Sequence, residues 1–207
     1  MGNGSRAVFA ADLAADAALA LGKADQASKL LAGALRGYPT EARQYIGRFR
    51  MPNNLAVLHA QKKNYAEARR LLEETLTPWE TRSMSSAYPF DAFAVLSRNL
   101  LIVFAVQGWS AEAESRYDSV KEKVQATVTS HPNSVQYRLG AGATLRALAA
   151  LAGTGPRAGE AEALAALAAE EETREAEFLQ TYKRAKGVCD EREVKGRTYR
   201  TCLLKLS

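Results

Sequence analysis

The residues best suited to chemistry in this sequence are two histidines and two cysteines. A histidine can act as a general base or a metal ligand, and a cysteine can act as a nucleophile, a zinc ligand or half of a disulfide. His59 falls on an inward position of a helical pattern, where a packed histidine is the commoner role, and His131 precedes a proline at a predicted helix end. Cys189 and Cys202 have no histidine near them in the sequence, so they do not complete a zinc site. We therefore expect no metal site.

Two glycine-containing segments and one run of acids could also carry chemistry. The segment Gly140-Ala141-Gly142 lacks the third glycine of a dinucleotide-binding loop and lies inside a predicted helix. The segment 153–159 lacks the lysine of a phosphate-binding loop. The acids from Glu170 to Glu172 are more typical of a solvated helix face than of a pair of catalytic carboxylates. The sequence therefore predicts a protein that is not an enzyme and that needs no cofactor.

Two asparagines, Asn54 and Asn99, are the strongest candidates for recognition. They hold the same place in two similar segments that lie 45 residues apart. An asparagine amide both donates and accepts hydrogen bonds, so it can pair with the backbone of a bound segment. Arg50 lies just upstream of the first asparagine, and Arg98 is next to the second. We predict that these four residues contact a protein partner; the other interpretation, that the asparagines cap or bridge neighbouring repeats, stays open.

The elements that must position these residues form repeated pairs of helices. Residues 54–68 align without a gap with residues 99–113, and each segment is apolar at helical spacing, breaks, and resumes as a second helix. A third copy lies upstream and matches the second half of this unit at a shift of 41 residues. The pattern predicts helical hairpins over about 7–39, 52–78 and 92–132.

Turn-forming residues and prolines divide these hairpins. The helices break at Lys63 and at Gly108, and Pro78 is expected to close the second helix of the middle hairpin. The linker 153–156 is a strong helix breaker. Residues 133–187 on either side of it predict a degenerate fourth hairpin whose last helix caps the array, since the ends of a repeat array need a polar outer face.

These segments resemble the tetratricopeptide repeat family. The resemblance covers about residues 7–130, and the stretch from Asn53 to Leu76 is most similar to the repeats of kinesin light chains. The family period is about 34 residues, so the longer shifts imply insertions between repeats. The later insertion spans about residues 77–89. The candidates for a partner contact in or beside it are Trp79, Tyr88, Pro89 and Phe90. The positions that fit the family pattern most closely are Leu55, Ala56, Tyr65, Ala68 and Leu72.

The resemblance implies an all-α fold, a right-handed superhelix of antiparallel helix hairpins spanning residues 1–187. It also implies that the concave groove binds an extended or helical segment of a protein partner. Asn54 and Asn99 match the slot at which the repeat domain of O-GlcNAc transferase uses asparagines to hold extended peptides. The leading prediction is therefore a protein–protein interaction module, acting as an adaptor or as a structural subunit of a larger assembly.

The tail, residues 188–207, departs from the helical period. Residues 191–201 alternate about a central Lys195-Gly196, which favours a short β-hairpin pairing Val194 with Arg197. Continued outward, this register puts Cys189 opposite Cys202, within reach of a disulfide. Whether the hairpin forms, and whether the cysteines are bonded or free, both stay open.

The tail also supports an alternative function. Between Lys183 and Ser207 the chain has eight basic and three acidic residues, so this region holds the whole net charge of +5. Clustered cations neutralise phosphates, and the alternative is a subunit that contacts RNA or another acidic surface through the tail. The residues predicted for this contact are Arg192, Lys195, Arg197 and Arg200.

No segment was expected to span a membrane, because none reaches about 20 consecutive apolar residues. Asp12 and Asp16 argue against a signal or transit peptide at the N-terminus. Residues 1–5 look like an added leader, and a natural one could have been removed. Two cysteines are too few for a disulfide scaffold. The compartment stays open, with an intracellular one, cytoplasm or organelle, favoured.

Overall fold

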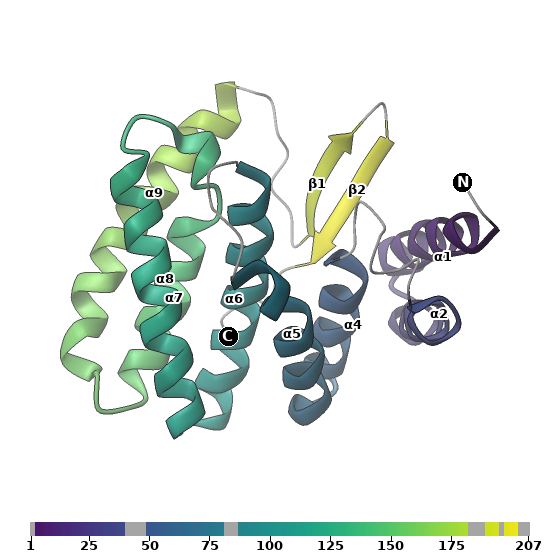
Figure 1. The fold of residues 1–207 in the computed structure, drawn as a ribbon, viewed down its shortest axis with the longest axis horizontal. Coiled ribbons are helices and arrows are strands. Elements are labelled where there is room, and N and C mark those ends of the chain that lie inside the picture. Colours follow the sequence, from purple (N-terminus) through teal and green to yellow (C-terminus); the bar gives the residue numbers. More distant parts are fainter. Residues whose placement is uncertain (1–2, 40–48, 81–86, 182–188, 195–196, 203–207) are drawn as a thin grey trace. The chain divides into compact units, whose positions relative to one another are not determined.

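The structure is a computed structural model of the 207-residue chain, and it describes residues 3–39, 49–80, 87–181, 189–194 and 197–202. The described part is all-helical up to residue 181 and ends in two short strands (Figure 1). The helices are α1 (Asn3–Ala20), α2 (Ala24–Gly37), α4 (Arg50–Gln61), α5 (Tyr65–Glu80), α6 (Ala87–Gln107), α7 (Ala111–Ser130), α8 (Ala141–Gly153) and α9 (Ala161–Thr181). Two short 3-10 helices are η1 (Val135–Tyr137) and η2 (Ala158–Glu160), and the strands are β1 (Cys189–Val194) and β2 (Arg197–Cys202).

The chain divides into two units, and the division falls within α5, between Leu71 and Leu72. The first unit contains α1, α2, α4, the start of α5 and both strands. The second unit contains the rest of α5 and helices α6 to α9. The predicted boundary between a helical domain and a tail, at 187–188, lies outside the described residues.

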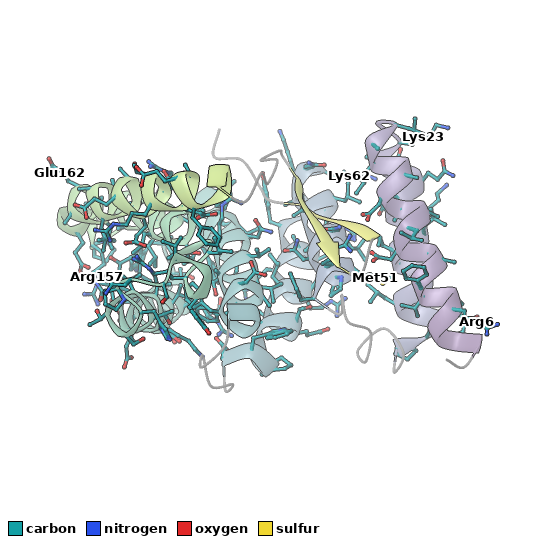
Figure 2. All side chains as sticks on the ribbon, turned by 90° about the horizontal axis from the view of Figure 1, so that it is seen from above. Arg6, Lys23, Met51, Lys62, Arg157 and Glu162 are labelled. Atoms are coloured by element: carbon teal, nitrogen blue, oxygen red, sulfur yellow. The ribbon has the colours of Figure 1, made fainter. Side chains whose placement is uncertain are left out.

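The first unit is built from small apolar residues at helical spacing. On α2 the buried residues Ala27, Leu31 and Ala34 follow the three- and four-residue steps of one helix face. They pack against α1, and Gly22 makes the turn between the two helices with a φ of +71°, a left-handed conformation that suits glycine. Figure 2 labels Arg6, in the first turns of α1, and Lys23, which immediately precedes α2. Helix α4 then packs against α2, and β2 packs against α4.

The second unit has α6 and α8 as its apolar helices. Both are buried along most of their length, and α6 contacts α7 and α8. Helices α8 and α9 make the closest pair, because Gly142 lets the backbone of α9 approach: a Cβ added at Gly142 would lie 2.7 Å from the backbone nitrogen of Glu172. Ser110 caps α7, its hydroxyl accepting from the backbone nitrogen of Ala113 at 3.1 Å.

Several predicted helix limits are confirmed and others are wrong. The breaks at Lys63 and Gly108 and the linker after Gly153 are present. Pro78, however, lies inside α5, which continues to Glu80. Gly140 is not inside a helix. It immediately precedes α8, and its φ of +87° is a left-handed conformation that suits glycine.

One helix is long and apolar enough to cross a membrane by length and composition. This is the window Phe90–Gln107 of α6, with a mean hydropathy of 1.5, and 78% of the window is buried in the structure. Helices in the core of a folded protein pass the same test.

Candidate functional site

Arg50, the first residue of α4, is buried in the first unit and holds two acids of α1. Its Nη1 lies 3.3 Å from Asp12 Oδ2, and its Nη2 lies 2.8 Å from Asp16 Oδ2. Asp12 and Asp16 are four residues apart, so they share one face of α1. The predicted partner-binding residue Arg50 therefore has a structural role: it ties α1 to α4.

The surroundings of Asp12 disfavour the charged form of its carboxyl group. The pKa of Asp12 is raised to about 6, mainly by burial and also by the charge of Asp16, while the Arg50 guanidinium opposes both. Oδ1 of Asp12 is buried without a hydrogen-bond partner in the described part of the chain. A buried carboxylate that lacks full pairing favours its protonated form. The free energy of unfolding should therefore depend on pH near neutrality.

Helix α4 also carries the predicted Asn54. Asn53 and Asn54 are both buried, and Asn53 Nδ2 donates to Asn54 Oδ1 at 3.3 Å. Every residue from Arg50 to Leu58 is buried, so this stretch of α4 has no solvent-facing side. One of the elements that packs against α4 within the first unit is the strand β2 (Figure 1). An extended segment of the chain itself thus lies on the helix that carries Arg50 and Asn54.

The other two predicted residues, Arg98 and Asn99, lie on α6 in the second unit. Asn99 is fully buried, and Arg98 Nη1 donates to Asn99 Oδ1 at 3.2 Å. Burial lowers the pKa of Arg98 to about 10, and the negative charge of Glu172 on α9 opposes that shift. The buried polar residues Asp91 and Ser97 lie on the same helix. Helix α6 is therefore an apolar core helix that carries a group of polar side chains.

The four predicted residues form two separate pairs. Arg50 and Asn54 come together on α4 in the first unit, and Arg98 and Asn99 come together on α6 in the second. Both asparagines are buried, so a partner would contact either of them only after the residues packed around it move.

The predicted nucleic-acid residues occupy β1 and β2. The strands pair antiparallel, with Val194 opposite Arg197 and Cys189 opposite Cys202. In this ladder, positions 192, 197 and 199 fall on one face and position 200 on the other, opposite Glu191. Lys195 lies outside the described residues. The register therefore groups Arg192 and Arg197 with Tyr199, and separates them from Arg200.

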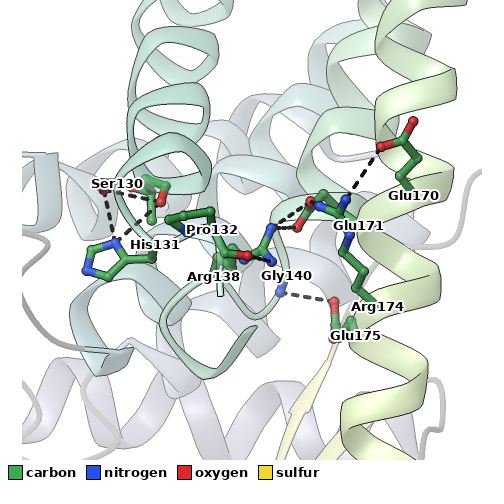
Figure 3. A network of polar contacts seen from close by, with 10 residues as sticks. Ser130, His131, Pro132, Arg138, Gly140, Glu170, Glu171, Arg174 and Glu175 are labelled. Atoms are coloured by element: carbon green, nitrogen blue, oxygen red, sulfur yellow. Dashed lines mark hydrogen bonds and ion pairs between the residues drawn. The ribbon is translucent and has the colours of Figure 1, made fainter. Parts of the chain in front are cut away.

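The acidic run on α9 is not a solvated face throughout. Glu171 is buried and accepts two hydrogen bonds from Arg138 Nη1, at 2.7 and 2.6 Å (Figure 3). Arg138 Nη2 also donates to the backbone oxygen of Pro132 at 2.8 Å, and Arg174 Nη1 donates to Glu171 at 2.7 Å. The close crossing of α8 and α9 brings Glu171 inward. Sequence reasoning missed this network, because the spacing of the acids alone does not tell which one faces the core.

A second polar cluster joins α7 to η2. Tyr117 donates to Glu160 Oε2 at 2.9 Å, Lys121 pairs with the same carboxylate, and Arg157 Nη1 lies 3.2 Å from its Oε1. The hydrogen bonds from Lys121 and then Tyr117 lower the pKa of Glu160 to about 2. Burial is the main cause that raises the pKa of Tyr117 well above its usual value. Figure 2 labels Arg157, which also pairs with acids on α7. This cluster fastens the α8–α9 connection to α7.

The two histidines have structural partners. His59 Nδ1 lies 3.3 Å from the side-chain nitrogen of Asn64, at the turn after α4. His131 stacks on Tyr137 with ring centres 5.0 Å apart, and its Nδ1 lies 3.0 Å from Ser130 Oγ. Within the described ranges, no group of three or more His, Cys, Asp or Glu residues could hold a metal ion.

Two of the candidates in or beside the predicted insertion have buried rings. Trp79 is 1% exposed and Phe90 is not exposed at all, so both belong to the core of the second unit. The prediction of a partner contact through these two rings is therefore wrong, and the side chains of Tyr88 and Pro89 lie outside the described part of the chain. Trp79 lies on α5 and Phe90 on α6, and an apolar ring on the inward face of a helix packs into the core.

Comparison with protein-family models, with curated proteins and with solved structures finds no significant match to this chain.

Proposed function

We propose that this chain is a protein–protein interaction module, an adaptor or a structural subunit of a larger assembly, and that α4 accepts an extended segment of its partner. The observation that carries the proposal is the contact between α4 and β2. A strand of the chain lies on the helix that bears Arg50 and Asn54, which makes that helix a surface suited to extended backbone. The partner segment takes the place that β2 occupies.

The buried amide side chains on α4 and α6 support this proposal. Asn54 on α4 and Asn99 on α6 are amides within largely apolar helices. In this structure the side-chain oxygen of each amide accepts a hydrogen bond, that of Asn54 from Asn53 and that of Asn99 from Arg98. Amides of this kind pair with peptide backbone regardless of the side chains it carries. We further propose the finer architecture that the repeat pattern favours, a tetratricopeptide-like right-handed superhelix of antiparallel helix hairpins that works without catalysis or a cofactor.

The test is a binding measurement on the full chain. A partner is first recovered by capture from source cells, with and without nuclease, and identified by mass spectrometry. The double variant Asn54→Ala plus Asn99→Ala should then bind that partner at least tenfold more weakly by calorimetry, corresponding to roughly 1–3 kcal/mol lost at each unpaired backbone group.

The control is Asn133→Ala, which removes the same amide from an exposed position. Because Asn53 donates to Asn54, circular dichroism must show that the double variant keeps its helicity at the temperature of the measurement. Equal affinity of the double variant and the unmodified chain would contradict the proposal.

A second candidate function is contact with RNA or a similar polyanion through the tail. The observation in its favour is that Arg192, Arg197 and Tyr199 share one face of the β1–β2 ladder, since cations beside an aromatic ring suit phosphates and stacked bases. Partner recovery would then be lost after nuclease treatment. The double variant Arg192→Ala plus Arg197→Ala, which removes both cations of this face, would abolish binding and flatten its salt dependence, while the asparagine variant would bind normally.

A further inference from the structure

The C-terminal hairpin places the only two cysteines of the chain at one register position. The sequence contains two cysteines, and the ladder pairs Cys189 directly with Cys202. Opposite residues in an antiparallel pair have Cα atoms about 4.5 or about 5.5 Å apart, depending on the hydrogen-bonding of the pair. Both values lie within the range of about 4.4–6.8 Å that a disulfide bridges. The backbone of the hairpin therefore brings the two residues to bonding distance without any rearrangement.

We propose that Cys189 and Cys202 form an intramolecular disulfide that closes the hairpin β1–β2. The pair is the last of the ladder, at the end away from the connection between the strands. A zinc site is the other use of paired cysteines, but such a site needs further ligands, and the described residues supply no metal-binding group. A disulfide between the two cysteines, in contrast, needs no further ligand.

The bond forms by exchange with a small-molecule disulfide such as glutathione disulfide. The thiolate of one cysteine attacks a sulfur of the oxidant, forms a mixed disulfide and releases one glutathione thiolate. The second cysteine, after losing its proton, attacks the protein sulfur of the mixed disulfide and releases the second glutathione thiolate. The two protein thiols together lose two electrons and two protons, and the oxidant gains the two electrons and is converted to two glutathione molecules.

The disulfide has a mechanical consequence for the first unit. An isolated two-stranded hairpin is at best marginally stable in water, and a cross-link between its ends removes many of the open conformations that compete with it. Because β2 packs against α4, the oxidised hairpin is held on α4 and the reduced hairpin is released more readily. The redox state of this pair thus sets how firmly β2 covers α4. The formation of the bond does not depend on the proposed function.

The first experiment measures the bond itself in the full chain. The protein is equilibrated with glutathione disulfide and glutathione, then analysed by thiol titration and by intact mass without reductant. The expected result is the loss of both thiols, two hydrogens fewer, and no attached glutathione. Free thiols, attached glutathione or cross-linked dimers as the main product would overturn the proposal.

The matched control shifts one cysteine by a single position. The variant Thr201→Cys plus Cys202→Ser keeps two cysteines, but position 201 pairs with Asp190 and lies on the other face of the ladder. It should keep free thiols or carry glutathione under the same conditions. Cyclisation of this variant as readily as the unmodified chain would show that tail mobility, rather than the register, joins the cysteines, and would overturn the argument.

The second experiment tests the consequence for α4. Amide hydrogen exchange is compared between the oxidised chain, the reduced chain and the variant Cys189→Ser plus Cys202→Ser. Exchange in residues 189–202 and in α4 should be slower in the oxidised chain than in the other two, which should agree with each other. Identical exchange in all three samples would show that the bond does not hold β2 on α4. Neither experiment involves a partner, so failure here is distinct from failure of the proposed function.

Discussion

At the scale of single residues, the structure turns several polar side chains inward that the sequence shows only as charges. Asp12 and Asp16 of α1 meet Arg50, and Glu171 of α9 meets Arg138. Ions removed from water are stabilised only when their partners are well placed, so each of these contacts is sensitive to the loss of one member.

We predict that Asp12 makes the stability of the chain fall as pH rises toward neutrality. Its pKa is about 6 in the folded chain and 3.8 as the unperturbed value, so its stabilising contribution is fully present below pH 3.8 and is lost as pH rises through 6. Between pH 5 and pH 7.5, the free energy of unfolding should fall by about 1 kcal/mol more for the unmodified chain than for Asp12→Asn.

Denaturant titrations at the two pH values measure this difference. The control is Asp25→Asn, an exposed carboxylate whose pKa is lowered by its hydrogen bond with Lys62, so it titrates below this pH range. Parallel pH dependence of the unmodified chain and Asp12→Asn would show that Asp12 is charged throughout.

We predict that breaking the Arg138–Glu171 pair costs far more than removing it whole. Both side chains are 2% exposed, so Arg138→Met alone leaves a buried carboxylate and should cost about 3–5 kcal/mol of unfolding free energy. The double variant Arg138→Met plus Glu171→Leu should cost less than that single change. Denaturant titration measures both, and Arg146→Ala, which breaks the more exposed pair with Glu172, should cost under about 1 kcal/mol. A double variant that is less stable than Arg138→Met would contradict this account.

At the scale of elements, close approach between α8 and α9 depends on one glycine. Gly142 and Gly153 both lie in α8, but only Gly142 faces another backbone: an added Cβ would lie 2.7 Å from Glu172 N and 3.0 Å from Ala168 O. Nothing lies within 4 Å of a Cβ added at Gly153. Substitution by alanine is therefore expected to change the unfolding free energy differently at the two glycines of this helix.

We predict that Gly142→Ala lowers the unfolding free energy by about 1–3 kcal/mol, since two helix backbones must separate to admit the methyl group. Gly153→Ala should leave it unchanged or raise it by up to about 1 kcal/mol, because alanine favours helix and restricts the unfolded chain. Thermal melts followed by circular dichroism compare the two variants. A stable Gly142→Ala with an unchanged midpoint would mean that α8 and α9 are not in this contact.

At the scale of the whole molecule, the described chain is helical through residue 181, with strand only in 189–194 and 197–202. Far-ultraviolet circular dichroism of the full chain should therefore show a dominantly helical spectrum. The reason is local: alanine-rich segments favour helix, and every predicted hairpin contains such a segment. A large sheet signal would contradict the architecture of both units.

The sequence by itself determined the helical class and most of the breaks, because these depend on neighbours in the chain. The periodicity of Ala27, Leu31 and Ala34 marks a buried helix face, and Lys63 and Gly108 stand where helices end. The spacing of Asn54 and Asn99 also singled out α4 and α6, two of the helices that carry buried polar side chains.

Only the tertiary structure decided what those polar groups face. Arg50 meets α1 acids from 38 and 34 residues away, and β2 reaches α4 from the other end of the chain. Contacts at such separations depend on how whole helices cross, which no local pattern encodes. The same reason explains why Glu171 is buried between the exposed Glu170 and the half-buried Glu172: helix periodicity offers several faces, and packing against α8 selects one.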